Sequence, residues 1–87
     1  MKDLCFRNWI TLEALVLAEN HNQLDKWGVQ NHSPFEWLTY TTEELGELAA
    51  AISEAEYRGG SVKDVVKEAI QTATLALKIA EMYRAYD

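Results

Sequence analysis

The stretch that decides the fold lies at residues 33–61 and reads SPFEWLTYTTEELGELAAAISEAEYRGGS. Its first residues are typical of a helix N-terminus. Ser33 can accept a hydrogen bond as the N-cap, Pro34 suits the first turn, and Glu36 completes a capping box. Apolar residues then recur at helical spacing until the Gly-Gly pair at 59 and 60, which is typical of a helix end. We therefore predict a helix from Pro34 to about residue 58.

A second helix is predicted directly after the Gly-Gly pair. Ser61 and Asp64 repeat the capping pattern, and an apolar stripe at helical spacing follows them. The stripe consists of Val62, Val65, Val66, Ala69, Ile70, Ala73, Leu77, Ala80 and Tyr83. Because only a short turn joins the two helices, we expect them to pack antiparallel to each other.

On the N-terminal side, two apolar stripes predict a further helix that is covered on two sides. One stripe holds Cys5, Trp9, Leu12 and Val16, and the other holds Phe6, Ile10, Leu17 and Leu24. We expect this helix to end near Trp27 and Gly28, since glycine commonly closes a helix. The uncharged segment WGVQNHS that begins at Trp27 is then the principal loop.

The three helical patterns, without strand signals of comparable strength, place the chain in the all-α class, and its length predicts a single domain of residues 1–87. A chain this short buries only roughly 60–65% of its unfolded surface. We therefore predict a helical bundle of about three main helices that is completed by oligomerisation.

The charge and the cysteine content of the chain limit which classes of partner and which cellular compartment we expect. The net charge of −6 disfavours nucleic acid as a partner. The longest uncharged stretches have nine residues, whereas a membrane-spanning helix needs roughly 20 apolar residues, so we expect no membrane partner. Cys5 is the single cysteine, and we expect a reducing, cytoplasmic location.

An acidic cluster is the main candidate for chemistry. Glu43, Glu44 and Glu47 share one region of the predicted helix at 34–58, where like charges destabilise each other and no Lys or Arg occurs between residues 26 and 58. The antiparallel partner helix would bring Glu68 and Gln71 into range. Carboxylate and amide oxygens suit Mg²⁺, with Mn²⁺ as the alternative ion. The plain alternative is a solvated acidic face, which is common on protein surfaces.

These residues resemble the MazG-like family of the all-α nucleoside triphosphate pyrophosphatase superfamily, which is marked by EExxE on one helix and ExxD on the next. Here the motifs read EELGE at 43–47 and EAIQ at 68–71. The resemblance implies metal-dependent cleavage of an NTP or dNTP to the monophosphate and pyrophosphate. It also implies a homodimer or homotetramer in which helices of different subunits complete four-helix bundles. It further implies that Glu44, Glu47, Glu68 and Gln71 bind the metal, with Gln71 where the family usually has Asp. Glu43, Glu44, Glu47 and Glu68 would be the catalytic acids.

The substrate's nucleoside would lie near the principal loop. Aromatic faces beside amide and imidazole groups can stack on and hydrogen-bond to a base, and a nearby cation can meet the phosphates. The candidate substrate-binding residues are Trp27, Gln30, Asn31, His32, Trp37 and Lys78. The alternative for the two tryptophans is packing within the bundle. The alternative function is a noncatalytic helical oligomer that binds a nucleotide or a protein partner.

Overall fold

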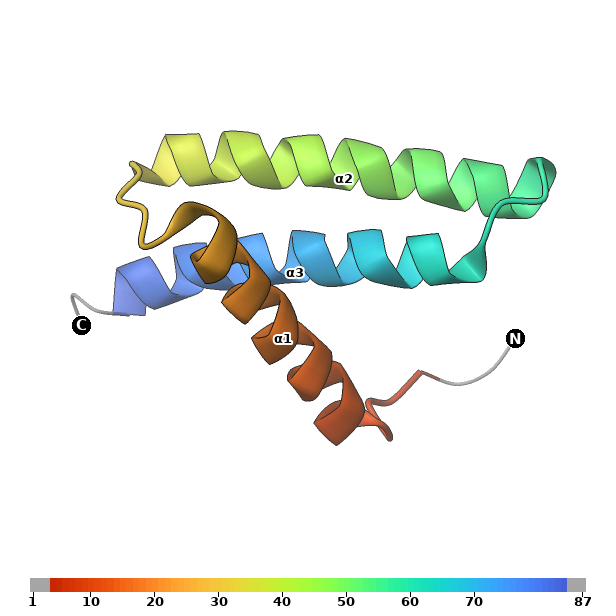
Figure 1. The fold of residues 1–87 in the computed structure, drawn as a ribbon, viewed down its shortest axis with the longest axis horizontal. Coiled ribbons are helices and arrows are strands. Elements are labelled where there is room, and N and C mark those ends of the chain that lie inside the picture. The colour runs from red at the N-terminus through yellow and green to blue at the C-terminus, as the bar shows by residue number, and fades with distance from the viewer. Residues whose placement is uncertain (1–3, 85–87) are drawn as a thin grey trace.

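The computed structural model describes residues 4–84, which form three helices (Figure 1). They are α1 (Trp9–Trp27), α2 (Pro34–Tyr57) and α3 (Val62–Arg84), and no strand occurs within residues 4–84. The all-α class is confirmed. None of the three helices is long and apolar enough to cross a lipid bilayer.

Helix α2 starts at the capping box that its sequence predicts. The Ser33 hydroxyl accepts a hydrogen bond from the Glu36 N–H at 3.2 Å, and the Glu36 carboxylate accepts one from the Ser33 N–H at 2.9 Å. Two N–H groups that have no partner within the helix are thereby satisfied. The expected N-terminus of this helix at Pro34 is confirmed.

The turn between α2 and α3 depends on two glycines. Gly59 has a φ of +71°, a left-handed conformation that glycine adopts without steric cost. The Gly60 N–H donates to the Glu54 carbonyl at 2.8 Å, which draws the chain back over the last turn of α2. A Cβ at residue 60 would lie 2.8 Å from the Glu54 Cβ and 2.9 Å from its carbonyl carbon. The tight turn makes α2 and α3 an antiparallel hairpin (Figure 1).

Gly60→Ala is therefore expected to destabilise the fold by about 1–3 kcal/mol, the usual cost of forcing extra atoms into a packed site. Gly46→Ala is the control, because nothing lies within 4 Å of the added Cβ and residue 46 is inside a helix. That change should stabilise the protein by about 0.5–1 kcal/mol. Urea unfolding followed by circular dichroism measures both, and equal effects of the two variants would contradict the proposed role of Gly60.

Helix α1 begins later than its apolar stripes suggest. Cys5 and Phe6 precede the helix, which starts at Trp9, because Phe6 has a left-handed φ of +56° that ends the helical pattern. Its C-terminus agrees with the prediction: Gly28 has a φ of +70°, and its N–H donates to the Leu24 carbonyl at 2.8 Å. The first apolar member of each stripe thus lies outside α1.

The packing of the three helices leaves much apolar surface open. Helix α1 contacts α3 but not α2 within the described chain, and only Gln23, Trp37 and Thr74 are buried there. The accessible surface is 7161 Å², against about 5,200 Å² for a typical folded monomer of this mass. The single chain therefore exposes more surface than is typical of a monomer of its mass.

Candidate metal centre

Three carboxylates converge between the two helices of the hairpin. Glu44 and Glu47 lie three residues apart on α2, a spacing that places them on neighbouring turns of one face. Glu68 comes from α3, which runs antiparallel beside α2. One oxygen from each of the three acids lies within 4.8 Å of the others. The expectation that Glu68 reaches the acids of α2 is met.

The electrostatics of the cluster centre on Glu44. The pKa of the Glu44 carboxyl is raised from 4.5 to about 7, first by burial and then by the negative charges of Glu47 and Glu68. No basic side chain offsets this crowding, since the ion pairs found in the described part of the chain join Arg58 to Glu54 and His32 to Glu36. The folded chain therefore holds concentrated negative charge without a counter-charge of its own.

Gln71 links the acids of the two helices. Both groups facing its amide are carboxylates, which only accept hydrogen bonds, so we assign the amide nitrogen to that side; it would then donate to Glu68 at 3.0 Å and to Glu44 at 3.1 Å when no cation is bound. These bonds hold Glu44 and Glu68 together across the α2–α3 seam. To serve as a metal ligand, the amide would turn so that its oxygen faces the ion.

Glu43 stands apart from the other acids of its motif. Its side chain is exposed, and it is not part of the three-carboxylate cluster. Glu43 precedes Glu44 by one residue, which corresponds to a rotation of about 100° around the helix axis. This rotation turns Glu43 away from the seam between α2 and α3. Its predicted catalytic role stays a prediction.

The chemistry of this donor set fits a hard divalent cation. Carboxylate oxygens and an amide oxygen are the groups that Mg²⁺ and Mn²⁺ prefer, and a partly open site leaves room for water or phosphate oxygens. The raised pKa of Glu44 means that its negative charge is unfavourable among the neighbouring acids, so a cation bound there would stabilise the ionised carboxylate. Glu44, Glu47, Glu68 and Gln71 are thus compatible with the predicted magnesium site.

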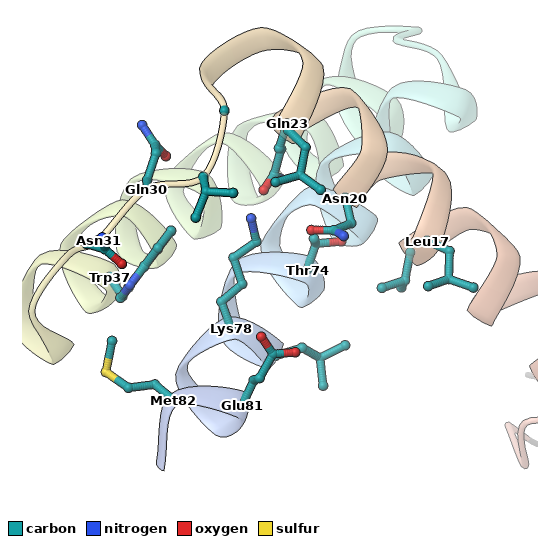
Figure 2. Close-up of a pocket in the computed structure, with 15 residues that line it drawn as sticks. Leu17, Asn20, Gln23, Gln30, Asn31, Trp37, Thr74, Lys78, Glu81 and Met82 are labelled. Carbon is teal, nitrogen blue, oxygen red and sulfur yellow. The ribbon is translucent and has the colours of Figure 1, made fainter. Parts of the chain in front are cut away.

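A groove of about 620 Å³ lies between α1, α3 and the loop that follows α1 (Figure 2). Four of the predicted substrate-binding residues line it: Gln30, Asn31, Trp37 and Lys78. Lys78 extends from α3 into this groove, and its Nζ lies 5.4 Å from the centre of the Trp37 ring. Such a contact is a favourable cation–π interaction.

His32 lies in a second hollow of about 440 Å³ that shares Gln30, Asn31 and Trp37 with the groove. Its ring packs edge-on against Trp37 and Tyr40, with ring centres 4.9 and 5.1 Å away. The His32 Nδ1 lies 3.7 Å from the Glu36 carboxylate, and the buried Nε2 has no hydrogen-bond partner. His32 therefore has one buried nitrogen without a hydrogen-bond partner, beside the second hollow.

Trp27 is not brought together with the other candidates. It lines neither hollow, it is largely exposed, and the Lys26 Nζ lies 4.8 Å from its ring centre. The predicted role of Trp27 in substrate binding stays without geometric support.

Several residues that line the groove were not predicted from the sequence as site residues. Gln23 is buried on α1 and donates to the Glu19 carboxylate at 2.8 Å, while Thr74 is the most buried residue of α3. The sequence pattern did not indicate Gln23 or Thr74, because a polar residue on an apolar face does not contribute to the hydrophobic periodicity. Spacing held a clue, since Gln23 follows Val16 by seven residues and Glu81 follows Lys78 by three.

No family model, curated protein or solved structure matches this chain.

Along the hairpin, the acidic cluster and the groove lie in register. Trp37 precedes Glu44 by seven residues on α2, and Lys78 follows Gln71 by seven residues on α3. Seven residues are two helical turns and a rise of roughly 10 Å, on the same face of each helix. The Trp37–Lys78 pair is thus displaced from the Glu44–Gln71 pair by the same distance on both helices.

Without metal, the free energy of unfolding is expected to fall as the pH rises from about 5 to about 8. The folded chain raises the Glu44 pKa to about 7, so it binds this proton more tightly than the unfolded chain does. The resulting stability is complete below the unfolded value of 4.5 and is lost as the pH rises through 7. Urea unfolding of the wild type and of Glu44→Gln at a series of pH values measures the effect.

In that comparison, the wild type should be the less stable of the two proteins at pH 8, and the difference should shrink toward pH 5. Glu36 has a lowered pKa because the Ser33 N–H donates to it, and it acts in the opposite direction, but both proteins retain it. A stability difference between the two that does not vary with pH would show that Glu44 does not titrate as described.

Proposed function

We propose that this chain is a metal-dependent nucleoside triphosphate pyrophosphohydrolase of the MazG-like kind, which converts an NTP or dNTP to the monophosphate and pyrophosphate. The observation that carries the proposal is the convergence of Glu44, Glu47 and Glu68 from two helices without a basic partner. An uncompensated cluster of this kind costs stability in the free protein, and a divalent cation would relieve that cost.

The roles follow from the positions of the side chains. Glu44, Glu47 and Glu68 would hold Mg²⁺ or Mn²⁺, and Gln71 would turn its amide oxygen toward the ion. Bound there, the ion would supply charge neutralisation for the phosphates and would favour attack by water. The resemblance would give Glu43 the task of orienting that water, which requires its exposed side chain to turn toward the cluster.

The register of the hairpin supports a nucleotide as the ligand. A nucleoside triphosphate has anionic phosphates at one end and a flat base at the other, so it requires a metal site and an aromatic groove at a fixed separation. Trp37 and Lys78 lie two helical turns from Glu44 and Gln71, with the amides of Gln30 and Asn31 at the groove wall. The groove would take the nucleoside and the acids would take the metal-bound phosphates.

One observation favours the noncatalytic alternative. The Gln71 amide already satisfies Glu44 and Glu68 by hydrogen bonding, and as a neutral ligand it would contribute less to metal binding than an Asp. A chain with these properties could hold nucleotide without cleaving it. The two functions differ in whether pyrophosphate is released.

The proposed enzyme is a homodimer or homotetramer in the cytoplasm. The exposed apolar surface of the single chain supports assembly, and the exposed thiol of Cys5 suits a reducing compartment.

Pyrophosphate release from a panel of NTPs and dNTPs tests the proposal. We expect release with Mg²⁺ or Mn²⁺ present and its loss on addition of a chelator. Equilibrium binding of the same nucleotides is measured in parallel with Ca²⁺ as a control ion. Binding without release under every metal would favour the noncatalytic alternative, and neither binding nor release would refute both.

A further inference from the structure

The groove between α1 and α3 contains a polar stretch made of three side chains, Asn20, Gln23 and Thr74 (Figure 2). Gln23 and Thr74 are buried, with exposed fractions of 7% and 2%, and Asn20 is half-buried one turn before Gln23 on α1. A buried polar side chain costs free energy unless its hydrogen-bonding groups have partners. Packing of α1 on α3 alone would be served better by apolar residues at these positions.

These three side chains keep most of their hydrogen-bonding capacity. One N–H of Gln23 donates to the Glu19 carboxylate, which leaves its second N–H and its carbonyl oxygen. The Thr74 hydroxyl donates to the Ile70 carbonyl at 2.8 Å, so its oxygen can still accept. The side-chain amide of Asn20 makes no hydrogen bond within residues 4–84. The groove wall thus offers donors and acceptors close together.

The charges in the groove suit an uncharged part of a ligand. The charged residues among those that line it are Lys78 and Glu81, which have opposite signs. An anionic phosphate would meet the repulsion of Glu81 as well as the attraction of Lys78. A neutral group that both donates and accepts would instead pair with the amides and the threonine oxygen. A sugar hydroxyl is such a group.

The polar stretch lies between the acidic cluster and the aromatic end of the groove. Thr74 follows Gln71 by three residues and precedes Lys78 by four, so the three residues lie on one face of α3 in successive turns. Trp37 is at the level of Lys78, whose Nζ lies 5.4 Å from its ring centre. In the view of Figure 2, Lys78 lies between Trp37 and Thr74. A nucleotide has the same order, with its sugar between its phosphates and its base.

The chemistry of the stretch distinguishes ribose from deoxyribose. A site for deoxyribose is best lined by apolar side chains next to C2′, because polar groups left unpaired there cost affinity. Here Gln23 and Thr74 are buried and Asn20 is unpaired, so a ligand without a hydroxyl would leave them without partners. A ribose would supply two adjacent hydroxyls that donate and accept.

We infer that Asn20, Gln23 and Thr74 bind the ribose hydroxyls of the nucleotide and make the protein select ribonucleoside over deoxyribonucleoside triphosphates. The inference rests on the proposed function, which leaves the sugar open. It gives a role to three residues that lie outside both the acidic cluster and the principal loop. It applies equally to a protein that binds nucleotides without cleaving them.

A comparison of ATP with 2′-deoxy-ATP tests the inference on the full chain, because the two nucleotides differ in one hydroxyl. With Mg²⁺ present, kcat/KM for pyrophosphate release should be at least about 10-fold higher for ATP, as expected when polar groups in a buried site lose their partner. The dissociation constants measured with Ca²⁺ should differ by a similar factor, so a noncatalytic protein is tested as well. CTP and 2′-deoxy-CTP should show the same preference, since it does not depend on the base.

Two variants test the assigned residues. Gln23→Leu and Thr74→Val remove polar groups with little change in size, and each should lower the ratio of ATP to 2′-deoxy-ATP activity at least about threefold. Thr72→Val is the matched control, because the Thr72 hydroxyl makes the same kind of bond, to the Glu68 carbonyl at 2.8 Å, but does not line the groove. It should keep the wild-type ratio. Both nucleotides are assayed on one preparation of each variant, so a misfolded fraction does not alter the ratio.

The outcomes separate the inference from the proposed function. Binding or release with a ratio near one, or with a preference for the deoxy form, would overturn the inference and leave the proposed function standing. A preference for ATP that persists in both Gln23→Leu and Thr74→Val, or that Thr72→Val lowers equally, would show that the polar stretch is not its source. If neither nucleotide is bound or cleaved, the proposed function and the inference both fail.

Discussion

Replacing Glu44 by Gln should lower the rate of pyrophosphate release by at least about 100-fold. Changes in residues that merely support a metal ligand typically cost 10- to 100-fold, and Glu44 would itself be a ligand. It is the acid on which the cluster converges: Glu47 and Glu68 both raise its pKa, and Gln71 donates to it. Steady-state release of pyrophosphate with saturating Mg²⁺ measures the loss.

Glu56→Gln is the matched control, because Glu56 is an exposed acid on the same helix and lies outside the cluster. It should keep the wild-type rate. The metal-free Glu44→Gln protein should also melt at the same or a higher temperature, since the change relieves repulsion. Full Mg²⁺-dependent activity in Glu44→Gln would mean that these carboxylates do not form the active centre.

Trp37→Ala should destabilise the protein by about 3–5 kcal/mol, the usual cost of removing a large aromatic side chain from a core. Trp37 is the one apolar residue in the described chain that is buried, and its ring contacts His32, Tyr40 and Lys78. Small domains have only about 5–15 kcal/mol in total, so this loss should leave much of the protein unfolded at 37 °C. Urea unfolding monitored by circular dichroism provides the measurement.

Phe35→Ala tests whether burial is the cause. Phe35 is an aromatic residue two positions earlier on α2, but its side chain is 80% exposed. Its removal should change the free energy of unfolding by no more than about 0.5 kcal/mol. Similar losses in the two variants would indicate that Trp37 is not the centre of the core.

The helix boundaries that sequence predicted well are those fixed by local chemistry. Ser33 and Glu36 form their capping box within four residues of chain, and Gly28 and Gly59 adopt the left-handed conformations that end α1 and α2. Each feature depends on neighbours in sequence, so its residue types suffice to predict it. The pairing of Glu44 with Glu68 followed in turn, because a short turn leaves an antiparallel hairpin as the simplest packing.

Features set by contacts between distant residues could not be predicted in the same way. No local pattern shows that Glu44 is the acid whose pKa is raised, because burial and the charges of Glu47 and of Glu68 on the other helix cause that shift. The start of α1 at Trp9 depends on the backbone conformation of Phe6, a residue type that rarely adopts a positive φ. Nor did any pattern reveal that α1 packs on α3 alone.

That single attachment of α1 has a consequence for the dynamics of the chain. Since α1 has no contact with α2, it can detach while the hairpin and its acidic cluster stay intact. Amide hydrogens of α1 should then exchange with solvent through local opening, at a lower free energy than those of α2 and α3. If the proposed homo-oligomer covers the exposed apolar residues of α1, exchange in α1 should also slow as the protein concentration rises, with little change in the hairpin.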